Sequence, residues 1–179
     1  MVGAYPVGIA VGPMTPAKTL AEFVAWAKSN PKQAAFGTPG NGNIPHFTGI
    51  LFARAAGIDL ENVPYKGSQP AIADTMGGQV AAVVTTLGDF ITQARAGKVR
   101  ILAHASNQRS PIAPEVPTFK EQGFNIEANG WYGLFAPAGT PPAVVERASR
   151  LVAQVQQTPA VRSRMEGFSL EVRPTTPTQ

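Results

Sequence analysis

Apolar residues recur at the three- and four-residue spacing of an amphipathic helix in three long segments of the chain. The first segment starts behind Thr15 or Thr19, either of which is a suitable cap, and ends at Asn30-Pro31. The second covers residues 44–56 and the third covers residues 141–156. The side chains expected to face the core from these helices are Leu20, Phe23, Val24 and Ala27; Phe47, Ile50, Leu51 and Ala55; and Val144, Val145, Ala148, Leu151, Val152 and Val155.

Short runs of apolar and β-branched residues alternate with the helical segments. The clearest are residues 34–37, 80–85, 99–103 and 131–136. This alternation predicts an α/β fold with a mostly parallel sheet that is flanked by helices on both faces. In such sheets a ligand binds beyond the carboxyl ends of the strands, where the following helices begin.

The turns between strands and helices carry the polar residues of interest. The stretch FGTPGNGNIPH, residues 36–46, holds three glycines, which indicates a backbone that must come close to a bound group. Farther along, we expect Ser68 to cap one helix, and Thr86 with Asp89 to form a capping box at the start of another. Helix N-termini that meet at one sheet edge favour an anion.

Composition narrows the possible functions. Hydrophobic residues make up 44% of the chain and charged residues 15%, as in an ordinary folded protein. The net charge of +4 is scattered, and no basic helix face carries interleaved aromatic residues, so we expect no nucleic-acid binding. There is no cysteine, and His46 and His104 are too far apart for a metal-ligand motif. We therefore expect no metal site and no cofactor.

Four strings that occur in order carry more specific information. They contain PYKGS, GGQV, RSP followed by PEVPTF, and APAGTP, in a chain that also has GTPGNGNIPHFTGILFARAAGID near its start. Together they resemble the substrate-binding proteins of tripartite tricarboxylate transporters, the TctC-like or Bug family. The resemblance runs from about Pro13 to Pro177.

The resemblance implies a fold and a function. It implies an α/β, type II periplasmic binding-protein-like lobe at residues 12–128, with residues 1–11 and 129–179 as a crossing strand and an incomplete second lobe. It also implies a solute-binding protein, without catalytic activity, that captures a small organic carboxylate in the periplasm. The other expected partner is a membrane permease.

The same resemblance makes the strand-end turns candidate ligand-binding positions. The candidates are Thr38, Gly40, Asn41, Gly42, Asn43, His46, Lys66, Ser68, Thr85 and Thr86. Asn43, Ser68 and Thr86 also suit a purely capping role, and Lys66 also suits a solvated loop. No acid or nucleophile is spaced to work with His46, so no catalytic residue is expected. We expect Trp131 and Tyr132 to be core residues.

Two alternatives to carboxylate capture stay open. The chain could be a truncated, non-transport fragment that binds ligand weakly or not at all and self-associates, as a homodimer or larger species, through an exposed apolar surface near residues 131–136 and 144–155. The chain could also be an enzyme for a phosphorylated substrate, because glycine-rich turns bind phosphate. The glycine-rich stretch has no GKS or GKT ending and does not match GxGxxG, so the enzyme is the weaker alternative.

Overall fold

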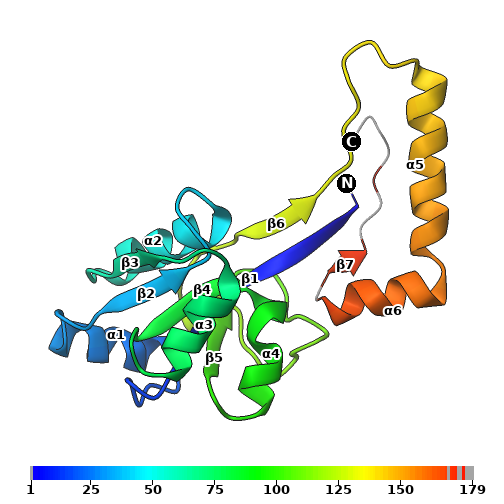
Figure 1. Cartoon of the computed structure of the whole chain (residues 1–179). Coiled ribbons are helices and arrows are strands. Elements are labelled where there is room, and N and C mark those ends of the chain that lie inside the picture. The colour runs from blue at the N-terminus through cyan, green and yellow to red at the C-terminus, as the bar shows by residue number, and fades with distance from the viewer. Residues whose placement is uncertain (1, 169, 173–174, 176–179) are drawn as a thin grey trace. The chain divides into compact units, whose positions relative to one another are not determined.

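The computed structural model describes residues 2–168, 170–172 and 175 (Figure 1). The chain divides into two compact units, which are described separately below. The larger unit is Pro6–Asn129, and the smaller unit combines Met1–Tyr5 with Gly130–Gln179. Strands β1 (Gly3–Val11) and β6 (Asn129–Tyr132) contribute residues to both units.

The larger unit is built on a sheet with the strand order β3-β2-β4-β1-β5. The other strands of this path are β2 (Ala35–Thr38), β3 (Glu61–Pro64), β4 (Ala82–Thr86) and β5 (Arg100–His104). Strand β2 is parallel to β3 and β4, whereas β1 is antiparallel to both β4 and β5. All strands of this path except β1 therefore run in one direction, which confirms the prediction of a mostly parallel sheet.

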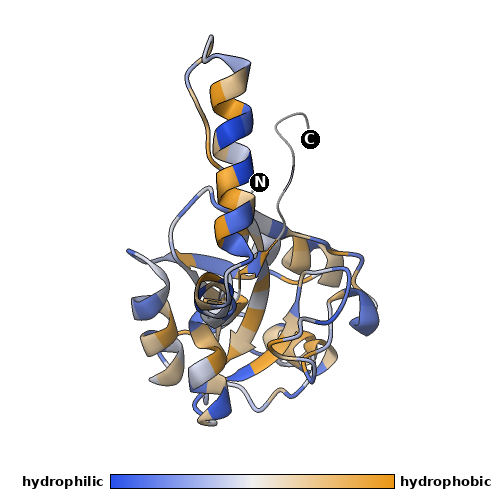
Figure 2. Cartoon of the chain, turned by 90° about the vertical axis from the view of Figure 1, so that its right-hand side faces the viewer, coloured by the Kyte–Doolittle hydropathy of each residue, from blue (hydrophilic) through white to orange (hydrophobic). Residues whose placement is uncertain are grey.

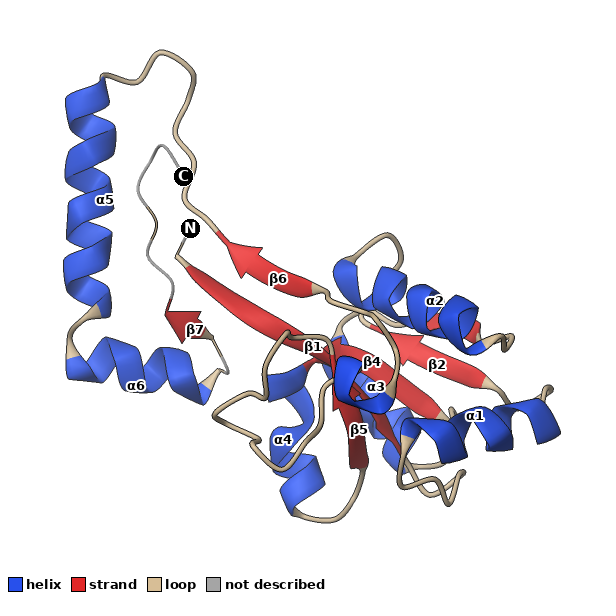
Figure 3. Ribbon diagram, turned by 180° about the vertical axis from the view of Figure 1, so that it is seen from behind, coloured by secondary structure: helices blue, strands red, loops and turns tan. Residues whose placement is uncertain are grey.

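Helices cover both faces of this sheet, as predicted (Figure 3). The helices of the larger unit are α1 (Leu20–Ser29), α2 (Ile44–Ala56), α3 (Ser68–Met76) and α4 (Leu87–Arg95), with a 3₁₀ turn at Lys120–Gln122. Phe36 and Gly37 are neighbours on β2 and so face opposite sides. Phe36 lies against Gly49 of α2, and Gly37 lies against Ala71 of α3.

The α2 face of the sheet is filled by phenylalanines. The ring of Phe52 lies 6.3 Å from that of Phe23, 5.5 Å from that of Phe119 and 5.1 Å from that of Phe124, measured between centroids. The opposite face is mostly aliphatic, and its buried cluster includes Ala10, Ala71, Ile72, Val83, Leu87, Phe90 and Ile91. Two separate apolar layers thus hold the sheet in place.

Helix α1 begins at one of the two predicted caps. Thr19 is its N-cap, and the Thr19 hydroxyl accepts a hydrogen bond from the backbone N–H of Glu22 at 3.2 Å. Leu20, Phe23 and Ala27 are buried, as the helical spacing predicted. The cap therefore fixes the register that turns this apolar face to the core.

The predicted apolar stripe of α2 is wrong. Phe47 is 54% exposed and Leu51 is 47% exposed, and Ala55 is exposed as well. The side that packs on the sheet consists instead of Pro45, Thr48, Gly49, Phe52 and Ala53. A Cβ atom added at Gly49 would lie 2.1 Å from the Phe36 ring, so the close approach of helix and sheet at this point requires glycine.

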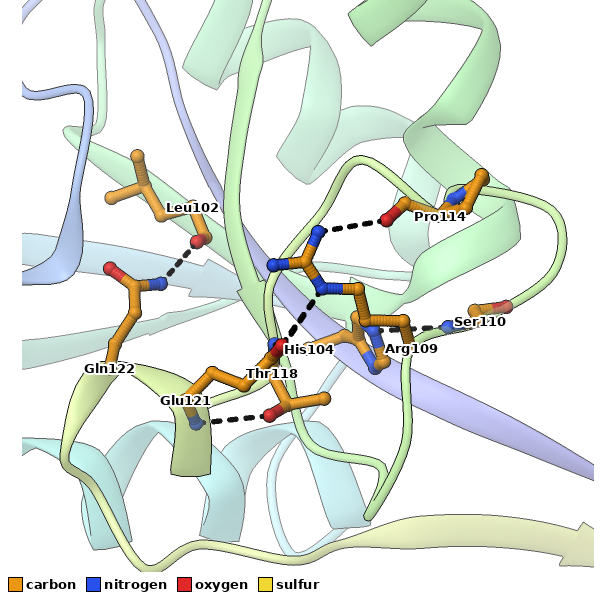
Figure 4. Close-up of polar contacts among 8 residues, drawn as sticks. All are labelled: Leu102, His104, Arg109, Ser110, Pro114, Thr118, Glu121 and Gln122. Atoms are coloured by element: carbon orange, nitrogen blue, oxygen red, sulfur yellow. Dashed lines mark hydrogen bonds and ion pairs between the residues drawn. The ribbon is translucent and has the colours of Figure 1, made fainter.

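Polar contacts fix the connection that follows β5 (Figure 4). Arg109 Nε donates to Glu121 Oε1 at 2.9 Å, and Arg109 Nη1 donates to the Pro114 carbonyl at 3.0 Å. The backbone N–H of Thr118 donates to Glu121 Oε2 at 2.7 Å. This N–H and, to a lesser extent, the Arg109 guanidinium lower the pKa of the Glu121 carboxyl.

Further hydrogen bonds join the same connection to β5. The backbone N–H of Ser110 donates to Nε2 of the buried His104 at 3.3 Å, and Gln122 Nε2 donates to the Leu102 carbonyl at 2.7 Å (Figure 4). The loop that contains the string RSP…PEVPTF is therefore held by hydrogen bonds to β5 at its start and to the 3₁₀ turn at its end.

The smaller unit contains α5 (Pro142–Gln156), α6 (Pro159–Gly167) and β7 (Glu171–Val172). Its strands β6 and β7 pair with β1. A Cβ atom at Gly130 would lie 2.0 Å from the Tyr5 ring, so glycine is needed there. The Tyr5 ring also lies 5.1 Å from that of Tyr132.

Three predictions for the smaller unit are wrong. Strand β6 ends at Tyr132 and does not reach residue 136. Trp131 and Tyr132 are exposed and are not core residues. The apolar face of α5 is not buried either, because the described part of this unit forms no second layer over it. Figure 2 shows apolar residues (orange) interleaved with polar ones along this helix.

Within the described residues, no helix has the length and apolar character needed to cross a membrane.

Candidate functional site

The ends of β2, β3 and β4 lie at one edge of the larger unit. These strands are parallel neighbours, with Thr38 of β2 opposite Pro64 of β3, and β4 on the other side of β2. Helices α2, α3 and α4 start directly after them (Figure 1). We call this region, residues 38–43, 64–68 and 85–89, the carboxyl edge. It brings together all ten sequence-predicted site residues except His46, which lies in the first turn of α2.

The first turn of the carboxyl edge is joined to β3 by side-chain hydrogen bonds. Thr38 is fully buried, and its hydroxyl lies 2.8 Å from Asn62 Oδ1 and 3.0 Å from the Gly40 carbonyl. Asn62 Nδ2 in turn donates to Asn41 Oδ1 at 2.8 Å. Thr38 therefore holds the turn in shape, and its hydroxyl already forms hydrogen bonds within the protein.

The glycines of this turn have the backbone geometry that favours glycine. Gly40 has φ +144° and Gly42 has φ +72°. Asn43 caps α2, because its side-chain oxygen accepts from the N–H of His46 at 3.0 Å. The N–H of Gly42 donates to His46 Nδ1 at 3.0 Å, which places the proton of a neutral His46 ring on Nε2. His46 thus orders the turn and keeps one ring donor.

The second turn of the carboxyl edge, residues 64–68, contains Tyr65, Lys66 and Gly67. Gly67 has φ +106° and occupies the N-cap position of α3, where no side chain caps the helix. Lys66 is exposed, and within the described residues it forms no ion pair. Burial and the hydrogen bond to Asp74, which is 2.9 Å long, raise the pKa of Tyr65 to about 12.

The two capping predictions at α3 and α4 are wrong. Ser68 is the first residue of α3 rather than its cap, and its hydroxyl lies 2.8 Å from the Thr85 hydroxyl. Thr86 is the N-cap residue of α4, but its side chain makes no capping hydrogen bond. Asp89 Oδ2 accepts from the Thr85 hydroxyl at 3.1 Å instead of closing a capping box. Two helices therefore start at the carboxyl edge without side-chain caps.

The uncapped starts of α3 and α4 make the carboxyl edge suitable for binding an anion. The first N–H groups of a helix have no partner within the helix, and the positive end of the helix dipole lies at the same place. The exposed Lys66 lies between β3 and α3 and adds a positive charge. This arrangement suits a small anion that accepts several hydrogen bonds. The described residues contain no cluster of metal-ligating side chains.

Two residues that bond to the carboxyl edge or lie in it, Asn62 and Asp89, are not among the predicted site residues. Asn62 lies within β3 and reaches the turn only because β3 is the neighbour of β2. The spacing of Asp89 from Thr86 matches a capping box and therefore predicts a cap rather than a site residue. Strand pairing and the true helix start are tertiary features, so local spacing gave no signal for either role.

The larger unit also has a cavity of about 470 Å³ away from these residues. It lies at the opposite edge of the sheet, where β1 ends and β5 begins. Its lining includes Val11, Gly12, Arg95, Lys98, Val99 and Arg100. None of the predicted site residues lines it.

Comparison with known proteins identifies a family and a relative. The family model described as "Tripartite tricarboxylate transporter family receptor" matches residues 1–179. BugT of Bordetella pertussis is 33% identical over 172 residues, which cover 96% of this chain and 52% of BugT. The chain thus spans about half the length of this relative.

Two solved structures share the fold. An R. palustris protein solved with adipate has a TM-score of 0.89 and 26% identity, over 99% of this chain and 60% of that one. MatC of Rhodopseudomonas palustris, solved with bound malate, has a TM-score of 0.84 and 29% identity, over 95% of this chain and 58% of MatC. The chain therefore has the fold of part of these longer proteins.

Proposed function

Because the chain belongs to the tripartite tricarboxylate transporter receptor family, we propose that it is a solute-binding protein that captures a small organic carboxylate. The carboxylate binds at the carboxyl edge of the larger unit. The observation that carries this proposal is that α3 and α4 both begin there without side-chain caps. A carboxylate has the charge and the acceptor oxygens that such helix starts favour.

The turns at the carboxyl edge have separate parts in this proposal. Gly40, Gly42 and Gly67 let the backbone approach the ligand, while Thr38 and Asn43 hold the first turn in shape. Lys66 attracts the anion, and Thr86 contributes a hydroxyl. His46 Nε2 offers one further donor.

The biological setting is part of the same proposal. By family, the chain acts in the periplasm, delivers its ligand to a membrane permease and does no chemistry. Residues 12–128 are one ligand-binding lobe, and residues 1–11 and 129–179 belong to a crossing strand and a second lobe. The bound adipate and malate of the similar structures support the carboxylate class of ligand.

Isothermal titration calorimetry with malate, succinate and adipate tests the proposal. We expect saturable binding of at least one acid, and a Lys66→Ala variant that binds about 2- to 5-fold more weakly, as removal of one partly screened charge implies. Lys98→Ala, at the opposite edge of the unit, is the matched control and should bind like the wild type. A folded chain that binds none of these acids, nor any other small carboxylate in a thermal-shift screen, would refute the proposal.

A second candidate function, self-association, is favoured by the exposed apolar side chains of the smaller unit. Phe135 is 84% exposed and Leu134 is 73% exposed, and Val144, Leu151 and Val155 are exposed as well. We call these five residues the α5 surface. Part of it lines a cavity of about 540 Å³, together with Val145, Ala148 and Val152. Exposed apolar surface of this kind is typical of interfaces.

Light scattering across a range of protein concentrations tests self-association. If the α5 surface is an interface, the wild type forms a dimer or larger species, and the double variant Phe135→Ser/Leu151→Ser is monomeric. Phe47→Ser removes an exposed aromatic side chain from the larger unit and should leave the assembly intact. A wild type that is monomeric at every concentration argues against this function.

A further inference from the structure

A short series of hydroxyl groups at the carboxyl edge ends on a carboxylate. The Ser68 hydroxyl lies 2.8 Å from the Thr85 hydroxyl, and the Thr85 hydroxyl donates to Asp89 Oδ2 at 3.1 Å. The Thr85 side chain is fully buried, whereas Ser68 and Asp89 are partly exposed. The series thus leads from the surface of the proposed site, through the protein interior, to a negative charge.

Counting protons fixes the direction of these hydrogen bonds. An ionised carboxylate only accepts hydrogen bonds, and each hydroxyl has one proton to donate. The Thr85 proton is directed at Asp89, so the Ser68 proton must be directed at Thr85. Ser68 then presents only its lone pairs to the outside of the series.

We propose that Asp89, acting through Thr85, makes Ser68 a hydrogen-bond acceptor, so that the site selects carboxylates that also carry a donor group. The donor would be a hydroxyl or an ammonium group on the ligand. This inference rests on the proposed function, because it concerns the same carboxyl edge. Asp89 is thereby a positioning residue that sets specificity.

The charge of Asp89 works in the same direction as the hydrogen bonds. A negative charge near Ser68 disfavours a second ligand carboxylate at that position and favours a group that donates a proton or carries positive charge. A plain acid offers no donor to the outward lone pairs of Ser68, so these stay without a ligand partner in the complex. The corresponding hydroxy acid supplies the missing hydrogen bond.

Matched ligand pairs that differ by one hydroxyl test the inference by titration calorimetry. The pairs are malate and succinate, 2-hydroxyglutarate and glutarate, and 2-hydroxyadipate and adipate. For the pair whose length fits, we expect the hydroxy acid to bind about 3- to 10-fold more tightly, the usual net effect of one hydrogen bond. The ratio of the two affinities is the readout, because a purely structural defect would weaken both acids alike.

Two variants change the series of hydrogen bonds at different residues. Asp89→Asn allows the hydrogen bonds to reverse, and Thr85→Val leaves Ser68 free to donate to the ligand. Each should reduce the preference for the hydroxy acid to less than about 2-fold. Asp59→Asn makes the same charge change at an exposed position before β3, away from the carboxyl edge, and should keep the wild-type preference.

The outcomes separate this inference from the proposed function. If the wild type binds the plain and hydroxy acids equally well, or if both Asp89→Asn and Thr85→Val keep the wild-type preference, the inference is wrong while carboxylate capture stands. If no member of any pair binds to the folded chain, the proposed function fails, and the inference fails with it.

Discussion

At the scale of single residues, Gly49 decides how closely α2 approaches the sheet. Its position above the Phe36 ring leaves no room for a side chain, since an added Cβ would lie 2.1 Å from a ring carbon. The same contact explains why the face with Gly49 packs on the sheet while Phe47 and Leu51 stay exposed. The spacing of apolar residues is therefore an incomplete guide to orientation where a glycine sets how closely a helix packs.

Gly49→Ala should destabilise the protein. The added methyl group must displace the Phe36 ring or the helix, and overpacking of this kind usually costs about 1–3 kcal/mol. Alanine has the better helix propensity, which offsets up to about 1 kcal/mol of this cost. Urea unfolding measures the net effect. Gly167→Ala in α6, where an added Cβ meets open space, is the control and should not lower the stability.

Tyr65 should ionise at unusually high pH. Its pKa of about 12 exceeds the ordinary value of 10.0, because of burial and then the hydrogen bond and charge of Asp74. The folded state therefore holds this proton more tightly than the unfolded state. The resulting stability is present below about pH 10 and is lost as the pH rises through about 12.

Ultraviolet absorbance titration of the three tyrosines checks this prediction. Asp74→Asn should lower the pKa of Tyr65 without restoring the ordinary value, because burial remains. Asp59→Asn should leave the titration unchanged. A titration in which Tyr65 ionises at the ordinary value would contradict the structure at this position.

At the scale of elements, the loop between β5 and the 3₁₀ turn depends on Glu121. The lowered pKa of its carboxyl means that the folded state binds this proton less tightly than the unfolded state. The loop is therefore stabilised above the ordinary pKa of 4.5, and the stabilisation is lost as the pH falls through the folded value.

Glu121→Gln should lower the urea midpoint at about pH 7, because the charged contacts to Arg109 and the Thr118 N–H are weakened. The difference from the wild type should shrink as the pH falls through the lowered pKa of Glu121, because the wild-type carboxyl then takes up its proton. Glu115→Gln, an exposed carboxyl outside the ion pairs of the described residues, serves as the control. An equal deficit above and below that pKa would mean that charge is not the cause.

The elements also show what sequence could and could not predict. The spacing of Leu20, Phe23 and Ala27 gave both the existence and the orientation of α1, because α1 has one clearly larger apolar face. Spacing predicted that α2 and α5 exist, but the predicted side of α2 is largely exposed and the apolar face of α5 is not buried. For α2 the contact at Gly49 sets the buried side, and for α5 the described residues include no layer that would bury its apolar face.

The same limit applies to the candidate site. The alternation of strands and helices predicts parallel strands, and the carboxyl ends of parallel strands share one edge, so the sequence alone places the strand-end turns together. Whether a hydroxyl caps its helix or bonds to the next strand depends on distances that only the packed sheet sets. Ser68 and Thr85, whose hydroxyls are 2.8 Å apart, are the clearest example.

At the scale of the whole molecule, the two units differ in how much core they hold. The buried phenylalanine and aliphatic clusters belong to the larger unit, whereas Ala4 is the one buried apolar side chain among the described residues of the smaller unit. A unit with so little buried apolar surface has little to offset its loss of chain entropy.

The smaller unit should therefore unfold first. The chain has two tryptophans, Trp26 in the larger unit and Trp131 in the smaller one, so single-tryptophan variants report on each. With Trp26→Phe the fluorescence follows Trp131, and its urea midpoint should lie below that seen with Trp131→Phe. Far-ultraviolet circular dichroism of both variants controls for the substitutions. Coincident transitions would indicate a single cooperative unit.

The central position of β1 has a consequence for how the chain reaches its fold. β1 leaves the ribosome ahead of the other described strands, yet its partners come much later, since Val7 pairs with Thr86 and Gly8 with His104. Strands β2, β3 and β4 can pair with one another beforehand, whereas β1 joins by closing long loops, a slow step in folding. Until then Val7, Ile9 and Val11, all buried in the finished sheet, form an exposed apolar strand. Among the described strands, the first to be synthesised is thus protected only after β4 and β5 have followed, and it is one that a chaperone would be expected to hold during synthesis.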